Sequence, residues 1–119
     1  LRNFVYVADA VDAFVRAGAD DRCNGEVFNV GGDRPMSHRE LTALLVKVSG
    51  SGRAEYIAWP PEKKAIDIGD FYADSSKFMK ATGWKPTVGL EDGLRRTVAF
   101  YRQHWDRYID RPVPTAGHV

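Results

Sequence analysis

The sequence predicts one small α+β domain built from three short strands and about four helices. Its 119 residues are 44% hydrophobic and 28% charged, which is the composition of an ordinary globular domain. Short β-branched and aromatic runs recur along the chain, and apolar residues at helical spacing fill the stretches between them. A chain of this length buries roughly two-thirds of its unfolded surface, which is enough for one modest core.

The first third of the chain reads as strand, helix and strand. Residues 4–7 are a β-branched and aromatic run, which predicts the first strand. Asp9 is the expected N-cap of a short helix, and Gly18 is its expected stop. The second strand is predicted over residues 27–30, before a glycine turn. The apolar stripe of the helix comprises Val11, Phe14 and Val15.

The middle of the chain carries the clearest helix signal. Ser37 and Glu40 have the spacing of a capping box, in which each side chain accepts from the other residue's amide. Apolar residues follow at helical spacing, and the Gly-Ser-Gly run at residues 50–52 ends the helix. Residues 55–59 are the third predicted strand, which Pro60 cuts short. The helix's apolar positions are Leu41, Leu44, Leu45 and Val48.

Two more helices are predicted before the carboxyl end. Asp74 or Ser75 caps a short helix that ends at Gly83. The last helix starts near Gly89 and runs to about Trp105. Its wet side carries the i,i+4 pairs Glu91–Arg95 and Asp92–Arg96. The segment 108–119 has no periodicity, so we expect a mobile tail after a lobe at residues 1–107.

Charge and cysteine content narrow the class of protein. Seventeen Lys and Arg against sixteen Asp and Glu give a net charge of +1, so no global field favours nucleic acid or an anionic membrane. The single cysteine, Cys23, has no partner for an internal disulfide, which favours a reducing, cytoplasmic compartment. No apolar run reaches the ~18–20 residues that span a bilayer.

Few side chains have the spacing of a catalytic or metal site. His38, His104 and His118 are far apart and have no partner at metal-ligand spacing. Neither the nucleophile elbow nor the complete dinucleotide fingerprint of glycines occurs. The chain opens without a methionine, which is typical of a piece of a longer protein, of processing or of an expressed fragment.

A basic, proline-opened loop is the best candidate for a binding site. Lys63 and Lys64 precede the aromatic pair Phe71 and Tyr72, and a lysine beside aromatics can hold an anion next to a sugar-like body. Each has a plainer interpretation, because Lys63-Lys64 could be a solvated pair and Arg2 a surface residue at a strand end. In an extended segment Phe71 and Tyr72 should face opposite ways, one buried and one exposed.

Six short segments say more by their order than any one of them says alone. They occupy residues 2–9, 26–32, 37–41, 69–77, 83–86 and 90–94. Together they resemble the C-terminal, substrate-binding part of the extended short-chain dehydrogenase/reductase family, the NAD(P)-dependent nucleotide-sugar epimerases and dehydratases. The resemblance implies a small C-terminal lobe of a Rossmann-type α/β enzyme, which closes over the nucleotide sugar.

The resemblance also implies a set of substrate-binding residues, namely Arg2, Lys64, Asp67 and Phe71. Arg2 occupies the position of an arginine that reaches the diphosphate, and Lys64, three residues before Asp67, replaces a second basic residue that is usually arginine. Lysine is a point charge without a two-pronged fork, so it specifies diphosphate geometry less tightly. Asn3 replaces the family's usual aspartate, and Phe71 is expected near the sugar pocket.

The family's catalytic and cofactor motifs are expected outside this chain. No tyrosine here has a lysine four residues later, so the resemblance assigns NAD or NADP and the acid–base pair to an N-terminal Rossmann domain. We expect no cofactor in this chain itself. A lobe without that domain should expose an apolar face, which would also allow a homodimer. The alternative function is a non-catalytic α+β module that binds a protein or a phosphorylated partner.

Overall fold

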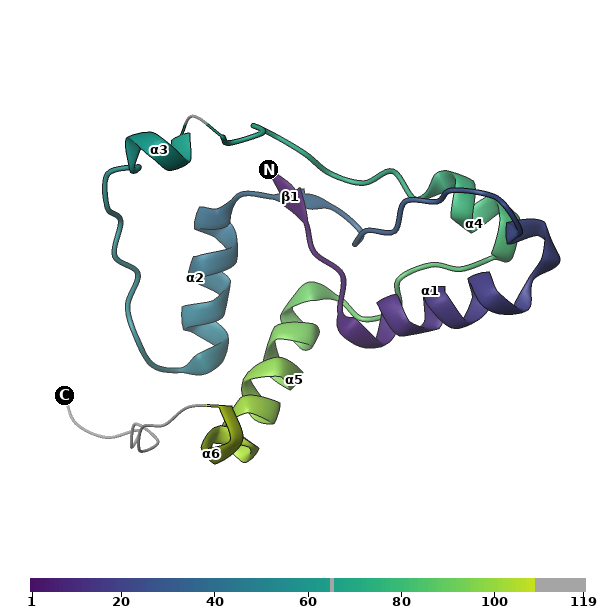
Figure 1. Ribbon diagram of the computed structural model, residues 1–119. Helices are drawn as coiled ribbons and strands as arrows, with labels where there is room; N and C mark the ends of the chain where they lie inside the picture. Colours follow the sequence, from purple (N-terminus) through teal and green to yellow (C-terminus); the bar gives the residue numbers. More distant parts are fainter. Residues whose placement is uncertain (65, 109–119) are drawn as a thin grey trace.

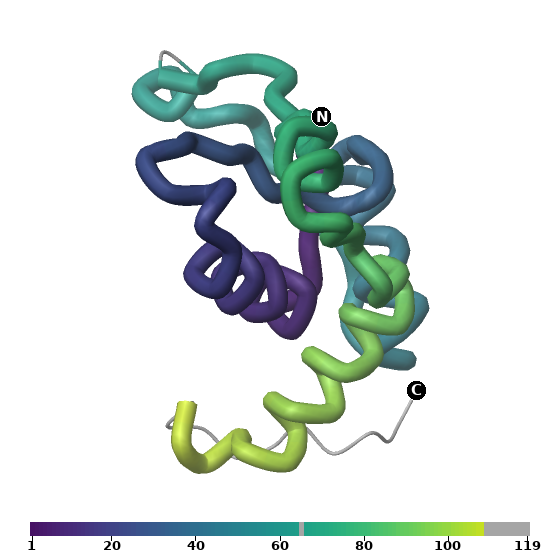
Figure 2. The backbone as a smooth tube through the Cα atoms, turned by 90° about the vertical axis from the view of Figure 1, so that its right-hand side faces the viewer, coloured from purple at the N-terminus to yellow at the C-terminus, as the bar shows by residue number. Residues whose placement is uncertain are grey.

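A computed structural model describes residues 1–64 and 66–108 as a helix-rich unit with one small sheet (Figure 1). Strands β1 (Arg2–Asn3) and β2 (Pro35–Met36) pair antiparallel. Helices α1 and α4 lie on one side of the molecule and α2 and α5 on the other, as the two views in Figures 1 and 2 agree. The helices are α1 (Val7–Ala19), α2 (His38–Ser49), α3 (Pro61–Lys64), α4 (Ser76–Thr82), α5 (Leu90–Gln103) and α6 (Trp105–Tyr108), with a 3-10 turn η1 (Asp21–Cys23). The mixed class of helices with a small sheet is as predicted, but the predicted numbers of strands and helices are not confirmed.

The main core lies between α1 and α4. Phe78 and Trp84 are each only 1% exposed, and their ring centroids are 5.6 Å apart. Ala13 and Cys23 complete the buried cluster, and Phe28 packs on its edge with its ring 5.2 Å from that of Phe78. Aromatic pairs at these distances add stabilisation beyond the area they bury. Side chains from α1, η1, α4 and the segment just after α4 therefore meet in one cluster.

Asp9 has a different role from the predicted N-cap. It lies inside the first turn of α1, whose N-cap is Tyr6, and is only 4% exposed. Its carboxylate accepts from the Thr87 hydroxyl at 2.7 Å, the Thr87 amide at 3.1 Å and the Val88 amide at 2.9 Å. Its own carbonyl accepts from the Trp84 indole at 3.1 Å. Asp9 therefore ties α1 to the segment that enters α5.

The charge of Asp9 is maintained despite its burial. Burial by itself raises the pKa of this carboxyl, but the hydrogen bonds from Val88 and Thr87 and the charge of Arg96 outweigh it. The pKa of Asp9 consequently lies below its ordinary value. A carboxylate held in this way stabilises the fold only while it is ionised.

The predicted capping box of α2 is confirmed. The Ser37 hydroxyl accepts from the Glu40 amide at 3.1 Å, and Glu40 accepts from the Ser37 amide at 2.7 Å. Gly50 ends the helix with φ 66°, which glycine adopts without a Cβ clash. Helix α2 packs against α5, and Lys47 pairs with Glu91 across the two helices at 3.1 Å.

The predicted ends of α4 are also confirmed. Ser75 holds the N-cap position and Gly83 ends the helix. The Asp74 carboxylate accepts from the Ser76 amide at 2.9 Å, whereas the Ser75 hydroxyl accepts from the Gly31 amide at 2.9 Å. The Asp74 side chain thus satisfies the first amide of α4, while the hydroxyl of the N-cap residue Ser75 anchors a distant loop.

Helix α5 starts as predicted but ends earlier. It follows Gly89 and stops at Gln103, and the expected pairs Glu91–Arg95 and Asp92–Arg96 form at 3.1 and 2.6 Å. His104 leaves the helical conformation, and its ring lies 4.6 Å from that of Phe100. Ring packing on Phe100 therefore accompanies the break, and Trp105 begins the separate turn α6 rather than ending α5. The predicted tail lies beyond the described residues, apart from Tyr108, which belongs to α6.

The three predicted strands are wrong in position. Within the described residues, the ladder joins Arg2–Asn3 to Pro35–Met36, while segment 4–7 leads into α1 and segments 27–30 and 55–59 form no ladder. β-propensity describes residues that fit a pleated surface, and it needs a neighbouring strand to take effect. The described chain offers these segments no such neighbour. Helix α1 also passes the predicted stop at Gly18 by one residue.

The described chain is open for its size. The Cα radius of gyration is 17.7 Å, compared with about 13–14 Å expected for a compact domain of this length. Many large apolar side chains are exposed, among them Val11 and Phe14 of α1. No helix of the described residues is long and apolar enough to cross a membrane.

Candidate functional site

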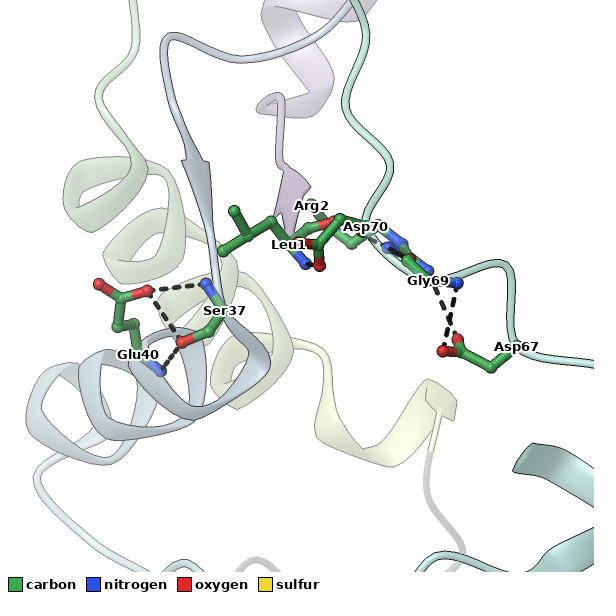
Figure 3. A network of polar contacts seen from close by, with 7 residues as sticks. All are labelled: Leu1, Arg2, Ser37, Glu40, Asp67, Gly69 and Asp70. Carbon is green, nitrogen blue, oxygen red and sulfur yellow. Dashed lines mark hydrogen bonds and ion pairs between the residues drawn. The ribbon is translucent and has the colours of Figure 1, made fainter.

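Arg2 on β1 is the best-placed candidate for binding an anion. Its Nη1 donates to the carbonyls of Leu1 at 2.7 Å and Gly69 at 2.6 Å, and its Nη2 lies 3.8 Å from Oδ1 of Asp67 (Figure 3). The Arg2 side chain is 26% exposed, so the guanidinium is fixed by carbonyls but remains reachable from solvent. A fixed, partly exposed guanidinium is the kind of group that binds phosphates or carboxylates.

The loop after α3 runs alongside the amino end of β1. The Phe71 amide donates to the Leu1 carbonyl at 3.1 Å, which brings the loop to the strand. The Asp67 carboxylate accepts from the Gly69 amide at 3.3 Å, and Gly69 takes φ 68°, which suits glycine. The Leu1 amino group pairs with Asp70 beside it (Figure 3). The structure therefore brings Arg2 together with the predicted loop.

Asp67 is the counter-ion of Arg2. The predicted site counted Asp67 among the residues that face the substrate, and the structure places its carboxylate at ion-pair distance from the guanidinium. At 3.8 Å the two groups attract but make no close hydrogen bond. Both side chains are partly exposed, so such a pair is worth about 1 kcal/mol or less.

Lys64 stands at the end of α3, three residues before Asp67. It is exposed, and its carbonyl accepts from the Asp67 amide at 3.4 Å. Among the described residues its ammonium has no carboxylate partner within ion-pair distance. Lys64 thus belongs to the same turn as Asp67, and its convergence with Arg2 on one anion stays a prediction.

Phe71 and Tyr72 do not alternate as predicted. Both are exposed, Phe71 at 57% and Tyr72 at 56%. The expectation of one buried ring is wrong because the segment crosses the surface, with β1 on one side of it and no second layer among the described residues. Phe71 is therefore free to meet a ligand at the end of the loop that contacts Arg2.

Asn3 is a positioning residue that sequence reasoning treated only as a departure. Its Oδ1 accepts from the Ala73 amide at 3.0 Å, and its Nδ2 donates to the carbonyls of Ala73 at 3.1 Å and Gly32 at 3.3 Å. The Asn3 side chain thus exchanges two hydrogen bonds with the backbone of Ala73, as a neighbouring strand would. An aspartate would lack the donor. The sequence signal for this role was the side-chain amide of Asn3, because an amide can both donate and accept hydrogen bonds.

Gly32 permits the close approach on which this arrangement depends. A Cβ at Gly32 would lie 1.8 Å from the Phe4 carbonyl oxygen, and one at Gly31 would lie 2.2 Å from Nδ2 of Asn3. A side chain at Gly32 would therefore force the backbone to move, whereas one at Gly31 would displace the Asn3 amide. The glycine pair therefore lets the loop before β2 lie against β1 and Phe4. The sequence had indicated only a turn at these glycines.

Comparison with known proteins finds relatives that are named as enzymes of nucleotide sugars. It is 38% identical over 102 residues to the UDP-glucose 4-epimerase of Mycolicibacterium smegmatis, covering 85% of this chain and 31% of that protein. It is 33% identical over 121 residues to the dTDP-glucose 4,6-dehydratase of Streptomyces griseus, covering 100% of this chain and 35% of that protein. No family model matches the sequence.

The fold agrees with these relatives. The crystal structure of UDP-glucuronic acid 4-epimerase from Bacillus cereus in complex with NAD superposes with a TM-score of 0.70 at 28% identity, over 87% of this chain and 32% of that one. The chain belongs to the extended short-chain dehydrogenase/reductase family. It corresponds to a C-terminal part, and it spans about a third of the length of the curated relatives it matches.

Within this member of the extended dehydrogenase/reductase family, the described residues offer binding chemistry. They contain no group of three or more His, Cys, Asp or Glu side chains that could hold a metal ion. His38 starts α2 and His104 follows α5, so these two imidazoles belong to different elements. What the Arg2 cluster supplies is a fixed cation, a displaceable carboxylate and an exposed aromatic ring. A set of this kind has the charge and the exposed ring that suit an anionic ligand.

Proposed function

We propose that this chain is the substrate-binding lobe of an NAD(P)-dependent nucleotide-sugar epimerase or dehydratase. The observation that carries the proposal is the Arg2 guanidinium, held by two carbonyls beside a loop that ends in an exposed aromatic ring. The named relatives act on nucleotide sugars, whose diphosphate is a bidentate acceptor for a guanidinium. Family membership favours this function over the non-catalytic module.

Diphosphate binding would replace the contact between Arg2 and Asp67. The guanidinium keeps its two carbonyl acceptors, which fix its plane, and exchanges a weak carboxylate partner at 3.8 Å for a phosphate. Lys64, one turn before Asp67, supplies a second positive charge from the loop. Phe71 then lies on the side where the sugar continues from the diphosphate. Each step uses side chains of this chain alone.

The remote diphosphate contributes to catalysis by positioning the sugar. Binding energy from a part of the substrate that does not react holds the reacting carbon in place, which lowers the entropic cost of the chemical step. NAD or NADP supplies hydride transfer in the parent enzyme, and we assign it to the part of that enzyme outside this chain. The residues of this chain bind the substrate by its diphosphate and so hold the sugar in place.

Kinetics of the complete enzyme test this proposal. We expect Arg2→Ala to raise KM for the nucleotide sugar about tenfold to a hundredfold, as loss of a charged contact does, while NAD(P) affinity stays unchanged. Arg22→Ala is the matched control, because Arg22 is exposed on η1 and pairs only locally with Asp20. Equal loss of substrate and cofactor affinity in the Arg2 variant would contradict the assignment.

A further inference from the structure

Segment 71–75 is held like a strand, although it forms no ladder within the described residues. The Phe71 amide donates to the Leu1 carbonyl at 3.1 Å, which attaches the start of the segment to the amino end of β1. The Ser75 hydroxyl accepts from the Gly31 amide at 2.9 Å, which attaches the end of the segment to the loop before β2. These two attachments are four residues apart, so the middle of the segment depends on a contact of its own.

Asn3 supplies the contact in the middle of the segment. Its Oδ1 accepts from the Ala73 amide at 3.0 Å, and its Nδ2 donates to the Ala73 carbonyl at 3.1 Å. The same Nδ2 donates to the Gly32 carbonyl at 3.3 Å, so one side-chain amide joins β1, the loop before β2 and segment 71–75. Ala73 is half-buried while both of its neighbours are exposed. The three attachments thus fall on alternate residues, as the two-residue period of an extended chain requires.

The attached segment is continuous with two groups of the candidate site. It begins with the exposed ring of Phe71, and two residues earlier the Gly69 carbonyl accepts from Arg2 at 2.6 Å (Figure 3). Arg2 stands between Leu1 and Asn3 in the sequence, so the guanidinium and two of the attachments come from one three-residue stretch. A shift of the segment along β1 would therefore change the distance between the cation and the aromatic ring.

We propose that Asn3 is a positioning residue for the substrate, which acts through Phe71 by fixing how far the ring stands from the Arg2 guanidinium. This role rests on the proposed function, in which the diphosphate lies at Arg2 and the sugar extends toward Phe71. Asn3 suits the role because its amide bonds both the N–H and the carbonyl of a single residue, Ala73. Two bonds to one residue fix the register of the segment, whereas a single bond would let it slide.

A purely structural role of Asn3 is the competing explanation. If Asn3 only stabilised the fold, its loss would reduce the fraction of folded enzyme, which lowers the apparent kcat and leaves KM unchanged. If Asn3 acts through Phe71, its loss lets the ring move and weakens the binding of the sugar, which raises KM. The two roles therefore separate in steady-state kinetics.

A double-mutant cycle in the complete enzyme, with UDP-glucose and dTDP-glucose as the probes, tests the connection between Asn3 and Phe71. We expect Asn3→Ala to raise KM about threefold to tenfold, with kcat within about twofold of wild type. Phe71→Ala should itself raise KM, and in that background Asn3→Ala should change KM by less than about twofold, because the ring that it positions is gone. Asn24→Ala is the matched control, since the Asn24 amide has a local contact with Asp21, and it should leave KM unchanged.

Gly31→Ala approaches the Asn3 amide from the other side. A Cβ at Gly31 would lie 2.2 Å from the Asn3 Nδ2, so it should displace the amide and raise KM about as much as Asn3→Ala. Combined with Asn3→Ala it should add less than about twofold, because the displaced group is already absent. Gly18→Ala is the matched control, since a Cβ there meets no atom within 4 Å, and equal effects of the two glycine variants would overturn the proposal.

The outcomes distinguish the role of Asn3 from the diphosphate role of Arg2. Independent effects of Asn3→Ala and Phe71→Ala on KM overturn the positioning role, and so does a fall in kcat with KM unchanged in Asn3→Ala. If Arg2→Ala leaves KM unchanged while Asn3 and Phe71 remain coupled, the positioning role stands and the diphosphate role is refuted. Failure of the complete enzyme to bind either probe, measured by calorimetry, would overturn both.

Discussion

The two sides of α1 differ in how far their side chains are buried within the described chain. On the inner side Asp9 and Ala13 are buried against the Phe78–Trp84 cluster, and the polar atoms of Asp9 have partners. On the outer side Val11 and Phe14 are exposed. Apolar periodicity therefore shows which residues favour burial but does not show what buries them. One helix can thus be buried on one face and leave apolar side chains exposed on the other.

Removing the Trp84 side chain should cause the largest loss of stability, because it empties part of the core beneath α1. Trp84→Ala deletes a side chain that is only 1% exposed and leaves a cavity beside Phe78. We expect a loss of about 3–5 kcal/mol in the free energy of unfolding, which approaches the whole stability of a small domain. Urea unfolding followed by circular dichroism measures it. Trp84→Phe, which keeps most of the volume but loses the bond to the Asp9 carbonyl, should cost markedly less; equal losses would contradict the cavity argument.

Replacing the Asp9 carboxylate should have the next largest effect. Asp9→Asn keeps the shape but exchanges a charged acceptor of three hydrogen bonds for a neutral amide, at an expected cost of about 2–3 kcal/mol. Asp12→Asn is the matched control, because Asp12 is on the same helix and pairs with Arg16 at the surface at 2.8 Å. The control should change stability by less than about 1 kcal/mol. Thermal unfolding compares the two, and equal shifts would refute the role of Asp9.

The helices were predictable because their signals are local. Ser37 and Glu40 lie three residues apart, and glycines such as Gly50 and Gly83 end helices through their own backbone conformation. The strands were not predictable, because a strand requires a neighbouring strand and the local sequence pattern does not identify that neighbour. The partners of Asp9 lie 78 and 79 residues away, a separation that hides its role from local reasoning.

The candidate site divides in the same way. Arg2 and its loop were predictable from the family resemblance, and the structure brings them together through Gly69 and Asp67. The paired contacts of Asn3 with Ala73 were not, since they depend on two segments 70 residues apart becoming neighbours. The position of Lys64 relative to Arg2 stays a prediction from the sequence.

Acid should reduce the stabilisation that Asp9 gives to the buried side of α1. The pKa of Asp9 in the folded chain lies below its ordinary value of 3.8, so its contribution to stability is complete above about pH 5. As pH falls through the lowered pKa, the folded carboxylate must be protonated and this contribution is lost. We expect the stability difference between wild type and Asp9→Asn to shrink below pH 3.8. A difference that stays constant between pH 6 and pH 3 would show that ionisation of Asp9 is immaterial.

The smallest effect is expected on the outer side of α1. Phe14→Ser removes a large apolar side chain that is mostly exposed, so little buried area is lost in the 119-residue chain. We expect its unfolding free energy to change by no more than about 0.5 kcal/mol, in contrast to the loss in Trp84→Ala. Urea unfolding of both variants under one set of conditions makes the comparison. A loss above about 2 kcal/mol would mean that Phe14 is already covered within this chain, and the two sides of α1 would then no longer differ in the way the structure describes.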